Sequence, residues 1–142
     1  NVLLYQNLGI AMISENRPEE AAIRLRKAIS LNKTDPALRN SLGVALTMMG
    51  KYSEAEEEYK KALQFDPTSI RARNNLGMLY LHTGRNDEAL VQFQETLRLQ
   101  PRFANAHYRL AVIFKRKGLN EKASYHYQEA IRINPEYEKM DF

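Results

Sequence analysis

The chain contains no cysteine and no tryptophan. Without cysteine it can form neither a disulfide framework nor a cysteine-ligated metal site. No apolar run in the sequence approaches the roughly 18 residues that a membrane-spanning helix needs. The 142 residues are 44% hydrophobic and 27% charged, which predicts a soluble folded protein and no membrane partner.

Catalytic motifs are also missing. The sequence contains no glycine-rich phosphate loop, no nucleophile elbow and no HExxH motif. The three histidines, His82, His107 and His126, have no histidine or cysteine partner at the sequence spacing of a metal site, so we expect solvated or groove-lining side chains. We therefore predict no enzymatic activity, no metal site and no cofactor.

A period of 34 residues organises the chain and is clearest around Asn74-Asn75-Leu76-Gly77-Met78-Leu79-Tyr80. A fixed period of this size is the mark of a stacked repeat array. Six columns recur without insertion or deletion: Leu8/Leu42/Leu76/Leu110, Gly9/Gly43/Gly77/Ala111, Met12/Leu46/Tyr80/Phe114, Ala21/Ala55/Ala89/Ala123, Leu25/Tyr59/Phe93/Tyr127 and Lys33/Pro67/Pro101/Pro135.

This pattern resembles that of the tetratricopeptide repeat (TPR) family, W-x-x-L-G-x-x-Y…A-x-x-x-F…P. The departures are Lys33 in the proline column and the residues of the tryptophan column, which are Tyr5, Arg39, Arg73 and His107. The resemblance implies an all-α fold, a right-handed α-solenoid of eight antiparallel helices. It divides a single array into four helix-turn-helix repeats, 2–35, 36–69, 70–103 and 104–137, followed by a tail at 138–142.

Local signals place the helices within each repeat. Helical spacing and turn residues predict helices over about 2–14, 18–31, 36–48, 53–65, 70–82, 86–99, 104–116 and 120–133. Asp35 reads as an N-cap, and Ser53 with Glu56 reads as a capping box. The glycine column falls inside helices, where glycine costs about 1 kcal/mol relative to alanine, so it needs a packing reason. Close approach of the two helices in each repeat is that reason.

Both ends of the sequence look incomplete. The chain begins at Asn1 inside a helical pattern, and residues 136–142 are too short for the polar capping helix of a repeat array. We therefore expect the chain to be an excerpt of a longer protein. The sequence does not determine the cell compartment, although the cytoplasm is slightly favoured. Apolar side chains are expected to be uncovered at Val2, Leu3 and Leu4, and at Ile131, Ile133, Tyr137 and Phe142.

In the TPR family the first helix of each repeat lines a concave groove that holds a peptide or a partner's helix. Asparagine amides both donate and accept hydrogen bonds, arginines pair with carboxylates, and methionines give adaptable apolar contact. The same columns also carry Gln6, Ile10, Ala37 and Ser41. The predicted partner-binding residues are Asn7, Asn40, Met48, Arg71, Asn74, Asn75, Met78, His82, Asn105, Tyr108, Arg109 and Arg116.

The charge of the chain indicates the kind of partner. The net charge is +4, with +2 on the third repeat and +3 on the fourth. This excess favours acidic protein or peptide segments and is too small to predict nucleic-acid binding.

The predicted function is a non-catalytic scaffold that binds a partner polypeptide in the groove. Two alternatives stay open: a substrate-recruiting arm of a larger enzyme, for example a glycosyltransferase, and a self-association module that stacks through its exposed ends. The resemblance to glycosyltransferase arms is an incomplete asparagine ladder, Asn7 and Asn75. A clamp for chaperone tails is rejected, because its first repeat needs a lysine and asparagine pair where Asn40 and Val44 stand.

Overall fold

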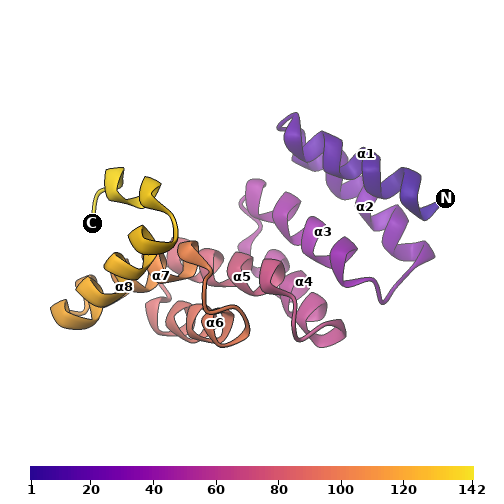
Figure 1. Cartoon of the computed structure of the whole chain (residues 1–142). Helices are drawn as coiled ribbons and strands as arrows, with labels where there is room; N and C mark the ends of the chain where they lie inside the picture. Colours follow the sequence, from indigo (N-terminus) through magenta and orange to yellow (C-terminus); the bar gives the residue numbers. More distant parts are fainter. The chain divides into compact units, whose positions relative to one another are not determined.

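Eight α-helices and one short 3-10 helix, with no strand, make up the chain (Figure 1). The computed structural model describes all residues, 1–142. The α-helices are α1 (Val2–Ser14), α2 (Pro18–Leu31), α3 (Pro36–Met48), α4 (Tyr52–Phe65), α5 (Ile70–His82), α6 (Asn86–Leu99), α7 (Ala104–Arg116) and α8 (Asn120–Ile133), and the 3-10 helix is η1 (Pro135–Lys139). The all-α, helix-turn-helix prediction is confirmed.

The chain divides into two compact units, residues 1–79 and 80–142, and α5 contains the boundary. In the first unit α1 packs on α2, α2 on α3 and α3 on α4, and α1 also contacts α3. In the second unit α6 packs on α7, α7 on α8, and α8 on η1. The largest fully buried side chains of the first unit are Leu25, Leu38, Leu46 and Leu76, and those of the second are Phe93, Thr96, Leu110 and Ile113.

Two glycines of the glycine column, Gly9 and Gly43, have the packing reason that the sequence predicts. A Cβ atom built on Gly43 would lie 2.5 Å from Tyr59 Cε1, and one on Gly9 would lie 2.6 Å from Leu25 Cγ. Real Cβ atoms do not approach other carbon atoms so closely. In each of these two repeats, a large side chain of the second helix therefore packs directly against the backbone of the first helix.

Short turns join the two helices of each repeat. Gly50, Gly84 and Gly118 have φ of 74°, 78° and 76°, the left-handed conformation that glycine adopts without steric cost. Asp35 caps α3, accepting hydrogen bonds from the Ala37 and Leu38 amides at 2.9 and 3.4 Å.

One predicted cap is wrong. Helix α4 begins at Tyr52, and its N-cap residue Lys51 makes no side-chain capping hydrogen bond. The Lys51 carbonyl already accepts the Ala55 amide at 2.9 Å, so Ser53 lies inside the first turn and cannot act as its cap. The predicted capping box of Ser53 and Glu56 therefore does not form.

The C-terminal segment is more ordered than expected. Residues 135–139 form η1, and Phe142 stacks on Tyr127 with ring centroids 4.3 Å apart. The expectation of uncovered apolar residues is therefore wrong at this end, where Ile131, Ile133, Tyr137 and Phe142 are all partly buried. At the other end Leu3 and Leu4 are exposed, as expected, whereas Val2 is partly buried.

The close approach at Gly43 gives a testable prediction. Gly43→Ala should lower the free energy of unfolding by about 1–2 kcal/mol, because the overlap with the rigid Tyr59 ring outweighs the helix propensity of alanine. Urea unfolding followed by circular dichroism measures the change. In a Tyr59→Leu background the same substitution should cost less, and an equal cost in both backgrounds would contradict the packing explanation.

Candidate functional site

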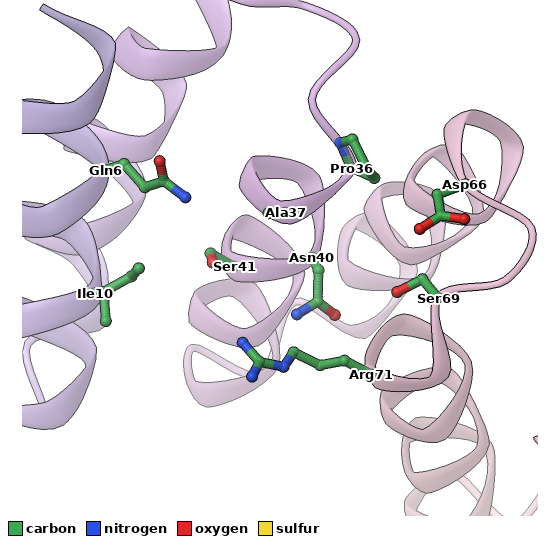
Figure 2. Close-up of a pocket in the computed structure, with 9 residues that line it drawn as sticks. All are labelled: Gln6, Ile10, Pro36, Ala37, Asn40, Ser41, Asp66, Ser69 and Arg71. Carbon is green, nitrogen blue, oxygen red and sulfur yellow. The ribbon is translucent and has the colours of Figure 1, made fainter. Parts of the chain in front are cut away.

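A pocket of about 250 Å³ lies in the first unit among α1, α3 and the start of α5 (Figure 2). Its wall carries amide, hydroxyl, guanidinium and carboxylate groups together with apolar ones. The lining residues are Gln6, Ile10, Pro36, Ala37, Asn40, Ser41, Asp66, Ser69 and Arg71. Of the predicted partner-binding residues, Asn40 and Arg71 therefore lie together at one pocket.

Asn40 is fixed in the pocket by the next repeat. Asn75 Nδ2 donates to Asn40 Oδ1 at 3.0 Å, and Asn40 is only 6% exposed. This bond uses the Asn40 oxygen and leaves its Nδ2 as a donor, which Figure 2 shows on the side of the pocket that faces α1. Two residues of the predicted asparagine set thus act as one group, with Asn75 holding Asn40.

The connection between α4 and α5 arranges the charges of the pocket. Asp66 Oδ1 accepts from the Thr68 amide at 3.0 Å and from its hydroxyl at 2.7 Å, so one oxygen of the carboxylate is bonded within its own turn. Ser69 Oγ accepts from the Ala72 amide at 3.2 Å and caps α5. Arg71, in the first turn of α5, is exposed and extends into the pocket toward α3 (Figure 2). The guanidinium is therefore the charged group most open to a ligand.

The other predicted residues of this unit do not line the pocket. Asn7 and Met48 are exposed, Met78 is partly buried, and Asn74 has its Oδ1 buried without a hydrogen bond. Sequence reasoning missed Pro36, Asp66 and Ser69 as lining residues. These three residues stand at helix starts or in the turn before α5, and their capping chemistry was the available signal.

In the second unit a pocket of about 460 Å³ borders α7 and the C-terminal segment. Its lining residues are Tyr108, Arg109, Val112, Lys115, Arg116, Asp141 and Phe142. Three of these seven side chains are cationic and one is acidic, so the pocket favours an anionic ligand. Predicted residues Arg109 and Arg116 lie here, whereas His82 is exposed at the end of α5 and lines neither pocket.

The prediction of an open binding face on α7 is wrong at Tyr108. It is 6% exposed, its hydroxyl donates to the Asp141 carbonyl at 2.7 Å, and its ring lies 5.2 Å from that of Tyr137. Asn105 Nδ2 reaches the Tyr137 hydroxyl at 3.4 Å. The chain's own segment 135–142 thus occupies the positions where the prediction placed a partner.

The histidines require a second correction. His107, expected to be solvated or groove-lining, is 6% exposed, and its Nδ1 lies 3.0 Å from Nδ1 of His126. The pair joins α7 to α8, and the sequence spacing of 19 residues gave no metal-site signal. The structure brings together no group of three or more potential metal-ligating side chains. None of its helices has both the length and the apolar character needed to span a bilayer.

Comparison with known proteins defines the class of this protein. Two family models, each described as tetratricopeptide repeat, match residues 36–102 and 74–138. The chain belongs to the tetratricopeptide repeat family. No curated protein sequence matches the chain significantly.

Solved structures show the same fold. A crystal structure of MamA superposes with a TM-score of 0.89 at 24% identity, covering 99% of this chain and 82% of MamA. MamA from Desulfovibrio magneticus RS-1, residue 41 to its end, gives 0.85 at 27% identity over 95% of this chain and 76% of that one. Pseudomonas aeruginosa PilF gives 0.87 at 24% identity over 94% and 61%. The family and fold support a protein-interaction scaffold in general, a class that is typically non-catalytic.

The asparagine pair can be tested separately from any partner. Asn75→Ala should lower the free energy of unfolding by about 1 kcal/mol, because it removes a partly buried hydrogen bond and leaves Asn40 Oδ1 without its donor. Asn7→Ala, at an exposed position of α1, should change it by less than about 0.5 kcal/mol. Urea unfolding of both variants checks the difference, and equal losses would show that the bond to Asn40 is not what Asn75 contributes.

Proposed function

We propose that this chain is a non-catalytic scaffold that binds a partner polypeptide on the first-helix face of its repeats, at the pocket among α1, α3 and α5. The observation that supports this most strongly is the Asn75–Asn40 hydrogen bond beside Arg71. It presents a fixed amide donor next to an exposed cation.

The polar groups of the pocket suit a peptide backbone. The Asn40 Nδ2 can donate to a peptide carbonyl, while the Gln6 amide and the Ser41 hydroxyl can each donate or accept. Ile10, 44% exposed, offers apolar contact to a side chain of the ligand. Backbone recognition of this kind holds an extended segment without reading every side chain.

The cationic side chains at the two pockets favour an acidic segment as the partner. Arg71 is the exposed cation of the first pocket. Asp66, the one acid among the lining residues, keeps its negative charge and binds Thr68 through Oδ1. In the second unit Arg109, Lys115 and Arg116 surround a separate pocket. Guanidinium groups bind carboxylates through charge-assisted hydrogen bonds, so aspartate or glutamate in the partner would be stabilised at either pocket.

Exposed leucines favour a second candidate function, self-association through α1. Leu3 and Leu4 are 62% and 54% exposed on the same helix. Light scattering over a range of concentrations separates the two functions. A constant monomer mass favours the scaffold alone, and a mass that rises with concentration favours association. The role of a recruiting arm in a larger enzyme uses the same pocket and is decided by a catalytic motif in flanking sequence.

An experiment on Arg71 tests the proposed function. Fluorescence anisotropy with acidic extended peptides, chosen from an array, should give binding that weakens roughly tenfold in Arg71→Ala, since a charge-assisted hydrogen bond is lost. The matched control is Arg24→Ala, an exposed arginine on α2 outside the pocket, which should bind as the native chain does. Equal effects of the two substitutions, with helicity intact, would contradict the pocket assignment.

A further inference from the structure

The second repeat contains a cross-link that ties its first helix to its second. Arg39 of α3 donates through Nη1 to Glu58 Oε2 of α4 at 3.1 Å, and through Nη2 to the Lys33 carbonyl at 3.1 Å. The Arg39 and Glu58 side chains are only 16% and 12% exposed. One residue of the tryptophan column thus holds both the partner helix and the turn that precedes its own helix.

The fourth repeat builds the same cross-link from different side chains. His107 of α7 contacts the Pro101 carbonyl through Nε2 at 3.0 Å and His126 of α8 through Nδ1 at 3.0 Å. Both cross-links join residues 19 apart. In both, the residue on the first helix of the repeat also contacts the carbonyl of the residue six positions before it. Two imidazoles therefore replace an arginine–glutamate ion pair at equivalent positions.

Hydrogen-bond chemistry fixes the protons of the neutral pair. A carbonyl only accepts, so His107 Nε2 carries a proton and its Nδ1 is an acceptor. His126 must then donate from its own Nδ1. One added proton can be shared, with either Nδ1–H donating to the other ring. A second proton places two N–H groups and two positive charges against each other at 3.0 Å, where no hydrogen bond remains.

We propose that the His107–His126 contact is an acid-sensitive latch between α7 and α8, which opens when both rings are protonated while the Arg39–Glu58 latch of the second repeat stays closed. The device lies wholly in the second unit and does not depend on the proposed groove binding. It gives the fourth repeat a response to pH that the second repeat lacks.

The surroundings of the pair decide how readily the second proton binds. Glu129 of α8 interacts electrostatically with both imidazoles and favours protonation, but it is itself bonded to Arg132, with the shortest contact at 2.7 Å. Tyr125 meets His126 edge-on, and Phe114 of α7 stacks on it at 5.5 Å. From α6, which packs on α7, Glu95 and Arg98 pair with each other at 2.9 Å.

Burial is the largest cause that lowers the pKa of His126. Together with the neighbouring His107, and against the opposing effect of Glu129, it brings this pKa to about 4. Because an unfolded histidine has a pKa of about 6.5, the unfolded chain binds the proton first as pH falls. The stability contributed by the latch is therefore complete above about pH 6.5 and is lost progressively down to about pH 4.

The test compares the full native chain with the double variant His107→Arg/His126→Glu, which installs the pair of the second repeat. Urea unfolding at pH 7 and pH 5 should show the unfolding equilibrium constant of the native chain rising roughly tenfold more than that of the variant. The same pH dependence in both chains would overturn the proposal, because it would assign acid sensitivity to other groups.

Hydrogen exchange supplies a readout that needs no variant. After correction for intrinsic exchange rates, protection of the α8 amides should fall between pH 7 and pH 5, while protection of α4, held by Arg39 and Glu58, should not. Parallel loss in both helices would overturn the latch. Nitrogen-15 spectra at pH 7 should show the Nε2–H tautomer for His107 and the Nδ1–H tautomer for His126, and the reverse assignment would also contradict it.

Discussion

Contact of a large side chain with a helix backbone is the constraint on which the repeats of the first unit depend. Tyr59 lies so close to Gly43 that a Cβ atom there would be 2.5 Å from its ring, and Leu25 lies 2.6 Å from the corresponding position at Gly9. Glycine in a helix interior costs about 1 kcal/mol, so these positions are explained only by the burial that close approach permits. This contact holds α1 on α2 and α3 on α4. It therefore determines which face of each first helix stays uncovered by its own second helix.

The remaining face of the first helices carries the polar residues that we propose bind a partner. In the first unit Asn40 of α3 is positioned by Asn75 of α5, so that a donor and the Arg71 guanidinium meet at one pocket. In the second unit the corresponding face of α7 is covered by segment 135–142 through Tyr108 and Tyr137, and a cationic pocket is left beside it. The same repeat architecture thus presents an open polar site in one unit and a partly self-occupied one in the other.

The helices could be predicted from the sequence because the period encodes them: Gly43 and Tyr59 recur in register with Gly9 and Leu25. The predicted helix starts differ from the structure only at Tyr52. The burial of Tyr108 could not be predicted, because residues 138–142 lie outside the period. The His107–His126 contact could not be predicted from the period alone, because its two residues stand in different columns. Comparison with Arg39 and Glu58, at the same spacing, was the signal that could have revealed it. The partner-binding role of the whole predicted set stays a prediction: Asn7, Asn40, Met48, Arg71, Asn74, Asn75, Met78, His82, Asn105, Tyr108, Arg109 and Arg116.

The most direct test of partner binding on the first-helix face is photo-crosslinking to an acidic peptide that binds the chain. A photoreactive side chain at Ala37, exposed on α3 and lining the pocket, is compared with one at Ile23, which is 63% exposed on α2. Binding in the pocket predicts adducts at position 37 that an excess of unlabelled peptide abolishes, and none at position 23. Competable adducts at position 23, with none at position 37, would place the partner on the second helices and contradict the proposed function.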